Sequence, residues 1–297
     1  MKKLFALIIL LSALVIATAV FADNTANTVF SEAVQTLNLM DDVVITSPGS
    51  LKTLRIMEID TPVKIKGSKN DFVTIKLLSS KKGSASLDLA YEIMGEEIWL
   101  AVEKVVRELF EEDVIEENLP IRENDDGVSL EDEDRKNVNL QEDSLQELSL
   151  DFWVEISIPT HMNVVLGETV NKGSIIGVAG VDMNAGIGDF VLENITGFVR
   201  IRDNAGTLRL KNVTGDVWIS DKGGAISVEN VTGLVTIDSD VGLALRVQDV
   251  TGDVTISSKL GGSAEVANVK GNVSVFSRAP IKTACIGITG NVIVPEN

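Results

Sequence analysis

The sequence predicts an all-β fold, a single-stranded β-solenoid (β-helix) with coils of 18–19 residues. A four-residue phrase of the type Asn-Val-Thr-Gly recurs, and its closing glycines are 18 or 19 residues apart. Valine or isoleucine stands two and four positions after each of these glycines, which is the alternation of a strand with one buried face. Only 4% of the residues are aromatic, so the core is expected to be aliphatic. The closing glycines are Gly197, Gly215, Gly233, Gly252, Gly271 and Gly290.

Each coil is expected to contribute two strands that share a common core with the coils stacked on either side. The strand after the phrase points these pairs inward: Val199 and Ile201, Val217 and Ile219, Val235 and Ile237, Val254 and Ile256, Val273 and Val275, Val292 and Val294. A glycine-containing turn, such as 204–206 or 223–224, is expected next. The second strand points these pairs inward: Phe190 and Leu192, Leu208 and Leu210, Ile226 and Val228, Leu245 and Val247, Ala264 and Val266, Thr283 and Cys285.

The phrase itself is interpreted as a corner of the coil. Its valine or isoleucine supplies a third inward layer, and its glycine marks a place where φ is positive or the backbone is crowded. Stacked asparagines are expected to bond one another and the turn backbone. Four asparagines also begin Asn-x-Ser/Thr acceptor patterns, and glycosylation stays a minor alternative. These are Asn194, Asn212, Asn230 and Asn272.

Strands are also expected before the repeats, in an N-terminal β-region over residues 23–106. Its alternating apolar positions include Leu54, Ile56, Val63, Ile65, Val73, Ile75 and Leu77. Residues 84–105 predict a hairpin that turns at Met94-Gly95-Glu96. A helix over residues 99–111 is the competing interpretation.

The remaining segments divide the chain further. Residues 1–22 read as a signal peptide, with Lys2 and Lys3 before an apolar run and a small-residue cleavage site before Asp23. A retained membrane anchor is the alternative. Residues 107–150 predict an acidic, partly disordered insertion. A calcium loop there would place Arg122 at its first ligand position, which makes a poor site. The repeats occupy residues 151–297, continuous with the N-terminal β-region.

The charge of the chain narrows the classes of partner. The formal net charge is −18, and removal of Lys2 and Lys3 with the signal peptide brings it near −20. A nucleic-acid partner is not expected, because phosphate binding requires a cationic footprint. No lipoprotein cysteine follows the apolar run, and no second segment is apolar enough to span a bilayer. The expected location is outside the cytoplasm: periplasmic, at the cell surface, or secreted.

No catalytic, cofactor-binding or metal-binding residue is predicted. Cys285 is the single cysteine and occupies an inward position, and His161, the single histidine, lies in an expected turn. Asp216 and Asp253 share one exterior position but are interpreted as turn acids. The candidate site is an exterior patch of aromatic and arginine side chains that suits a glycan or a protein partner: Phe198, Arg200, Arg202 and Trp218.

The order of segments resembles a known family. An export signal precedes a short β-region, the strand Val154-Glu155-Ile156-Ser157-Ile158-Pro159, and coils that continue through Val294. This layout resembles the exported bacterial putative-adhesin family, a β-strand-repeat domain of unknown function. The resemblance implies a β-solenoid of the cell envelope and supplies no catalytic residues.

We therefore expect a non-enzymatic structural or adhesive module of the cell envelope. A carbohydrate-active enzyme or polysaccharide-binding protein on a β-helix is one alternative, and an envelope assembly or signalling partner is another. The last strand, 292–294, has no evident cap, so association of copies through the solenoid ends is also expected.

Overall fold

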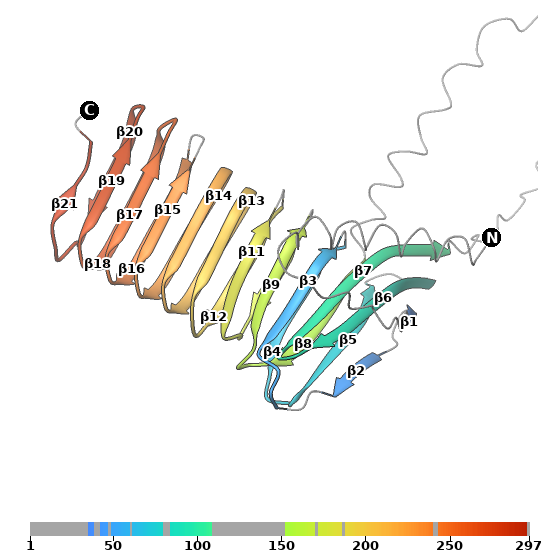
Figure 1. The fold of residues 1–297 in the computed structure, drawn as a ribbon. Coiled ribbons are helices and arrows are strands. Elements are labelled where there is room, and N and C mark those ends of the chain that lie inside the picture. The colour runs from blue at the N-terminus through green and yellow to red at the C-terminus, as the bar shows by residue number, and fades with distance from the viewer. Residues whose placement is uncertain are drawn as a thin grey trace, which may run out of the picture. The chain divides into compact units, whose positions relative to one another are not determined.

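A computed structural model describes residues 35–38, 42–46, 49–59, 61–79, 84–108, 152–169, 172–185, 188–239 and 243–295. Every regular element among these residues is a β-strand, and the repeats stack coil on coil along one axis (Figure 1). The predicted all-β solenoid is therefore confirmed. No helix in these ranges is long and apolar enough to cross a membrane.

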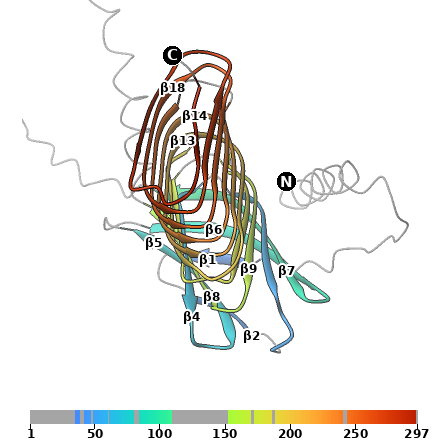
Figure 2. The ribbon, with the colours of Figure 1, turned by 90° about the vertical axis from the view of Figure 1, so that its left-hand side faces the viewer.

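Parallel strands form two columns along the stack, and Figure 2 looks along it from the C-terminal end. The first column holds the strands that follow the phrase, preceded in the stack by β9 and β11. In order these are β9 (Asn163–Thr169), β11 (Gly180–Ala185), the first parts of β13 (Val199–Thr214) and β14 (Val217–Thr232), β15 (Val235–Ser239), β17 (Val254–Ser258), β19 (Val273–Ser277) and β21 (Val292–Ile293). The second column holds β10 (Gly173–Ile176), β12 (Phe190–Ile195), the second parts of β13 and β14, β16 (Leu243–Thr251), β18 (Gly262–Lys270) and β20 (Ile281–Ile286).

The predicted inward positions form the core. From Phe190 to Val275 each predicted residue is at most 4% exposed, and the apolar residue inside the phrase is buried from Ile195 to Val269. The last coil departs from this pattern. Val292 and Val294 are 44% and 42% exposed, and Cys285 is only half-buried. No further coil packs on these side chains within the part of the chain that the structure describes.

The N-terminal strands are wound into the same two columns. β3 (Thr53–Ile59) lies between β7 (Glu97–Glu108) and β9, and β4 (Val63–Ser68) lies between β8 (Phe152–Pro159) and β10. All four of these pairings are parallel. One N-terminal coil, β3 and β4, is thus inserted between strands that follow it in sequence, an arrangement that periodicity did not predict.

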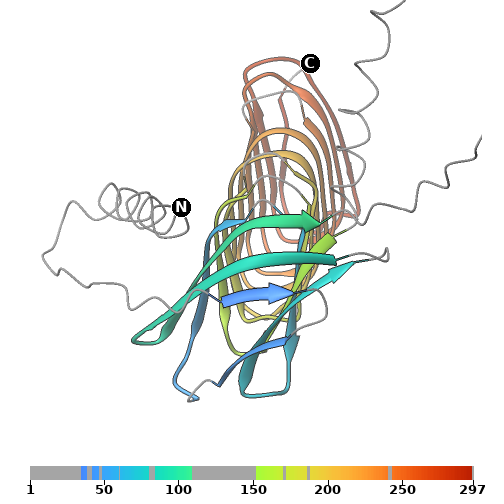
Figure 3. The ribbon, with the colours of Figure 1, turned by 90° about the vertical axis from the view of Figure 1, so that its right-hand side faces the viewer.

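Antiparallel strands extend the N-terminal end of both columns (Figure 3). β5 (Phe72–Ser79) pairs with β8 and with β2 (Asp42–Thr46), while β6 (Ser84–Met94) pairs with β7 and with β1 (Gln35–Asn38). The β6–β7 pairing confirms the predicted hairpin. The competing helix is wrong as far as residue 108, because Ile98, Leu100 and Val102 alternate into the core.

Asparagine fixes the corner at the phrase. Among the described residues, five other than glycine have φ between 55° and 59°, and all of them occupy the first position of the phrase: Asn194, Asn212, Asn230, Asp249 and Asn268. Asparagine and aspartate tolerate this left-handed conformation better than most residues, and glycine adopts it freely, as Gly287 does in the last coil. The predicted side-chain ladder is present, since the Asn212 amide donates to Asn194 Oδ1 at 2.9 Å and the Asn230 amide donates to Asn212 Oδ1 at 2.8 Å.

The closing glycine is required by the closeness of the next coil. A Cβ atom on Gly233 would lie 2.2 Å from the carbonyl oxygen of Gly215, and one on Gly215 would lie 2.4 Å from that of Gly197. These distances are far inside van der Waals contact. The glycine ladder therefore permits backbone-to-backbone packing between coils.

The opposite corner depends on coil length. In the two 18-residue coils, β13 and β14 continue around it as single strands, paired with each other through register shifts, where turns were expected. The 19-residue coils contain one extra residue here, and each divides into two strands. Buried serines lie at the end of the first strand, and Ser258 Oγ donates to the carbonyl oxygen of Gly261 at 2.8 Å.

Carboxylates connect neighbouring coils at both corners. Asp216 accepts the backbone N–H of Leu234 at 2.9 Å, and Asp253 accepts that of Asn272 at 2.7 Å. Asp189 accepts the backbone N–H of Thr207 at 2.9 Å. This backbone hydrogen bond, with a further one from the Thr207 side chain, lowers the pKa of Asp189. The turn acids of the sequence thus have a defined structural role.

Several predicted features lie outside the described residues. These are the signal peptide over residues 1–22, nearly all of the acidic insertion over 107–150, and the calcium loop that begins at Arg122. β7 continues through Glu108, so residues 107 and 108 of the predicted insertion belong to a strand.

Replacement of Val235 by lysine tests the register of the core. Val235 is 1% exposed, so an unpaired ammonium would be buried and the free energy of unfolding should fall by about 4 kcal/mol or more. Thr236→Lys, one residue along the same strand and pointing outward, is the control and should change stability by less than about 0.5 kcal/mol. Urea unfolding followed by circular dichroism gives both values. Equal stability of the two variants would contradict the register.

Replacement of Gly233 by alanine tests the packing at the phrase. The added methyl group would meet the Gly215 carbonyl at a residue whose φ is 149°, and a loss of about 2–4 kcal/mol is expected. Gly49→Ala is the matched control, because nothing lies within 4 Å of its Cβ position. Thermal melting of both variants provides the comparison. An unchanged melting temperature for Gly233→Ala would show that the coils do not approach this closely.

Candidate binding surface

One row of outward side chains runs along the first column. The pairings place Trp99 beside Arg55, Arg55 beside Val165, Val165 beside Asp182, Asp182 beside Arg200, and Arg200 beside Trp218. The row crosses β7, β3, β9, β11, β13 and β14, which lie side by side in Figure 1. Adjacent strands are separated by about 4.8 Å, so Trp99 and Trp218, five strands apart, are separated by roughly 24 Å.

Three of the four predicted patch residues come together on this row. Arg200, Arg202 and Trp218 line a shallow depression of about 240 Å³. Both arginines contact the carboxylate of Asp182 on β11: Arg202 donates to Oδ1, and Arg200 Nη1 lies 4.0 Å from Oδ2. Asp182 thus holds the two guanidinium groups on the same side of the face. The sequence did not single it out.

Phe198 lies apart from this depression, at the corner that leads into β13. It is 46% exposed, and its ring covers Gly180, where an added Cβ would lie 3.0 Å from a ring carbon. The Trp218 side chain is 36% exposed. The predicted patch is thus a three-residue depression with a neighbouring aromatic ring. Both aromatic groups remain accessible to a partner.

The core holds the patch rigidly from behind. Val199, Ile201, Val217 and Ile219 alternate with the patch residues along β13 and β14 and are at most 1% exposed. Since inward and outward positions belong to the same strands, the spacing of the patch is fixed by the packing of the solenoid. A partner would meet a surface that requires little ordering on binding.

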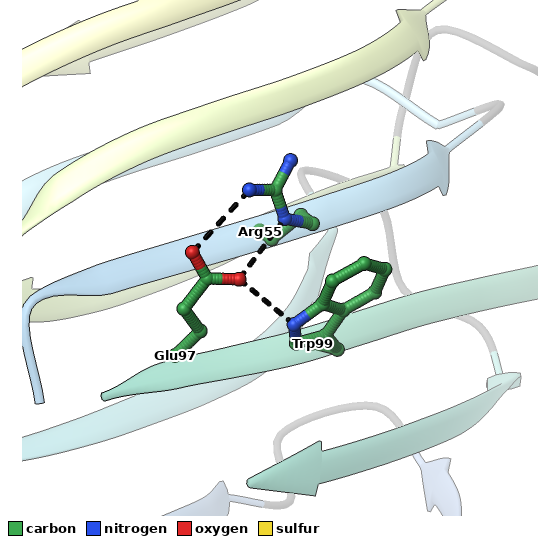
Figure 4. Close-up of polar contacts among 3 residues, drawn as sticks. All are labelled: Arg55, Glu97 and Trp99. Atoms are coloured by element: carbon green, nitrogen blue, oxygen red, sulfur yellow. Dashed lines mark hydrogen bonds and ion pairs between the residues drawn. The ribbon is translucent and has the colours of Figure 1, made fainter. Parts of the chain in front are cut away.

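A second group of tryptophan, arginine and a carboxylate lies at the N-terminal end of the same row. Glu97 accepts the Trp99 indole N–H at 2.9 Å, and its two carboxylate oxygens lie 3.3 and 3.4 Å from Arg55 Nε and Nη2 (Figure 4). The Arg55 guanidinium lies 4.8 Å from the centroid of the Trp99 ring, within cation–π range. Strand alternation implied that these side chains point outward, but their pairing joins segments 42 residues apart.

The single histidine and the single cysteine have structural surroundings. His161 lies in the turn between β8 and β9, and its Nε2 is 3.1 Å from the carbonyl oxygen of Leu51. Cys285 was expected to be buried but is half-buried in the last coil, where burial raises the pKa of its thiol. A raised pKa disfavours the nucleophilic thiolate.

The carboxylates considered for catalysis are engaged in the corners described above. Asp216 and Asp253 each accept a backbone N–H from the next coil. The structure brings together no group of three or more His, Cys, Asp or Glu side chains suited to a metal ion among residues 35–295, the gaps given above excepted.

No protein-family model and no curated protein matches the chain. A putative adhesin from Bacteroides fragilis is 12% identical over 87% of this chain and 96% of its own, with a TM-score of 0.37. A putative cell adhesion protein from Clostridium sporogenes is 12% identical over 84% and 99%, with a TM-score of 0.27. A putative adhesin from Parabacteroides distasonis is 9% identical over 85% and 95%, with a TM-score of 0.38. All four matched structures are described as a putative adhesin or a putative cell adhesion protein. Likeness at this level transfers no ligand or activity to this chain.

Proposed function

We propose that the chain is an exported, non-enzymatic β-solenoid that serves as a structural or adhesive module of the cell envelope. The observation that carries the proposal is the rigid outer face on which Arg200, Arg202 and Trp218 are held exposed and in register. Tryptophan and arginine are the side chains that most often dominate binding energy at interfaces. A flat, preorganised face of this kind suits a large partner, an envelope glycan or an envelope protein.

A binding role accounts for the exterior acids better than catalysis does. Glycoside hydrolysis uses two carboxylates that flank one bond, and the acid among them needs a raised pKa. Asp216 and Asp253 instead hold backbone N–H groups of neighbouring coils. The alternative of an enzyme would therefore need other acids.

Export is supported by the N-terminal sequence. Lys2 and Lys3 precede an apolar run, and the segment ends in Val20-Phe21-Ala22 before the polar Asp23-Asn24. A formal net charge of −18 suits a solvated protein outside the cytoplasm.

Cosedimentation with the insoluble envelope fraction of the source cells tests the proposal. Wild-type protein should bind, and Trp218→Ala and Arg202→Ala should each weaken binding about tenfold, because each removes an exposed anchor. Thr255→Ala is the control: Thr255 lies on the same outward row, two strands beyond Trp218. In the same cultures, the chain should be recovered outside the cytoplasm with Asp23 at its N-terminus.

Three results would overturn the proposal. Equal binding by wild type, the patch variants and the control would show that the patch does not take part in binding. Absence of wild-type binding would show that the chain does not adhere to the envelope fraction. Release of new reducing ends from the envelope glycan by purified chain would establish the enzyme alternative.

Association between solenoid ends is a further part of the proposal. Val292, Ile293, Val294 and Ile286 expose apolar surface on the last coil. Two copies would therefore meet through their C-terminal coils and form a closed dimer. Light scattering at increasing concentration should give a mass of two chains, and Ile293→Lys should return it to one. A constant single-chain mass would contradict this expectation.

A further inference from the structure

A hollow of about 260 Å³ lies on the outer face of the second column, near its N-terminal end. Four adjacent strands form its floor and walls in the order β2, β5, β8 and β4, which Figure 1 shows side by side. The hollow arises from the sizes of the outward residues. Thr74 and Ser157, which pair directly across β5 and β8, are small and form the floor, and longer side chains surround them.

Two ion pairs form part of the wall. Lys66 Nζ lies 2.6 Å from Glu155 Oε1, and Lys76 Nζ lies 2.7 Å from Asp42 Oδ2. Exposed ion pairs contribute little to the free energy of folding. Stability therefore does not account for the presence of four charged side chains around one depression. The two pairs fix the positions of two cations and two anions, and the wall has no net charge. This neutrality contrasts with the formal net charge of −18 of the whole chain.

The rest of the lining consists of Phe72, Asn70, Ser68 and Val44, of which Val44 is 51% exposed. Phe72 is 37% exposed at the edge of the hollow, although large apolar side chains are usually buried. Asn70 lines the hollow from the loop between β4 and β5, and its backbone N–H donates to Ser68 Oγ at 3.1 Å. The Asn70 side chain supplies two donors and one acceptor.

We propose that this hollow binds one uncharged sugar ring of a glycan. The apolar face of the ring stacks on Phe72, and its hydroxyl groups bond to Asn70, to Ser157 and to the charged heads of the wall. Hydroxyl groups both donate and accept, so they match a wall that presents ammonium and carboxylate groups together. The volume lies just below the range of about 300–1,000 Å³ for pockets that hold drug-sized ligands, which suits a single ring.

The inference rests on the proposed adhesive function and names a ligand class for it. It concerns the second column, whereas the patch of Arg200, Arg202 and Trp218 lies on the first. The two surfaces are therefore separable by mutation.

Saturation-transfer NMR and calorimetric titration of the whole chain test the proposal. The probes are methyl glycosides of glucose, galactose, mannose, N-acetylglucosamine and glucuronic acid. At least one uncharged glycoside should bind with a dissociation constant of about 10 mM or tighter. Phe72→Ala should weaken this binding at least tenfold, and Ser157→Tyr, which fills the floor from outside the core, should abolish it.

Val191→Ala is the control. Val191 is an exposed apolar residue on the same outer column, on β12, and it does not line the hollow. The affinity of Val191→Ala for the glycoside should equal that of wild type, and the melting curves of all variants should coincide. If Ser157→Tyr melts at a lower temperature than wild type, the binding of Phe72→Ala alone tests the proposal.

The proposal fails if no uncharged glycoside binds at about 10 mM, if glucuronide binds better than every uncharged probe, or if Phe72→Ala binds as wild type does. Loss of envelope cosedimentation in Trp218→Ala together with a hollow that binds no sugar would overturn this inference alone. Sugar binding in the hollow by a chain that does not cosediment would overturn the proposed function alone.

Discussion

The approach of one coil to the next at the phrase corner is the constraint on which the rest of the structure depends. There the backbone of one coil packs against the carbonyl group of the coil before it, and a single added methyl group would not fit. The asparagine that precedes it turns the chain through a left-handed conformation and bonds to its counterpart one coil back. Because this contact is repeated at every coil, the strands stay in parallel register. The register then aligns valine and isoleucine inside and a row of polar and aromatic side chains outside.

Both candidate surfaces are products of that register. The patch on the first column and the hollow on the second are assembled from strands that are distant in sequence but adjacent in the stack. Their charged groups are mostly paired, so they are oriented without adding much stability. The 19-residue coils, from β15 onward, continue the outward row of Arg200 and Trp218 with threonine and serine: Thr236, Thr255 and Ser274.

Periodicity alone predicted the solenoid, its coil length and nearly every buried position of the repeats. The reason is that each coil must bury the same two faces against its neighbours and does so with apolar residues at the same positions. It also predicted that Arg200, Arg202 and Trp218 point outward. What it did not predict depends on contacts between distant segments: Asp182 beside both arginines, Glu97 beside Arg55, and the hollow between β2 and β4. The turn expected at the opposite corner in the 18-residue coils was replaced by continuous strand, because parallel pairing with the neighbouring coil satisfies the backbone there. Cys285 occupies an inward position, yet it is half-buried because burial in a solenoid requires a coil on each side.

The insertion of β3 and β4 between later strands affects the order in which the fold assembles and the end from which it unfolds. In a simple solenoid each coil touches only its neighbours in sequence, so structure grows from any point and frays from either end. Here β3 can pair with β7 early, but its other neighbour β9 and both neighbours of β4, which are β8 and β10, lie within residues 152–176, so these contacts are long in sequence and slow to form. Once formed, the β3–β4 coil has a parallel neighbour on both sides and cannot detach by itself. Unravelling by heat or by a protease is therefore expected to begin in the C-terminal coils, where each coil contacts only its neighbours in sequence.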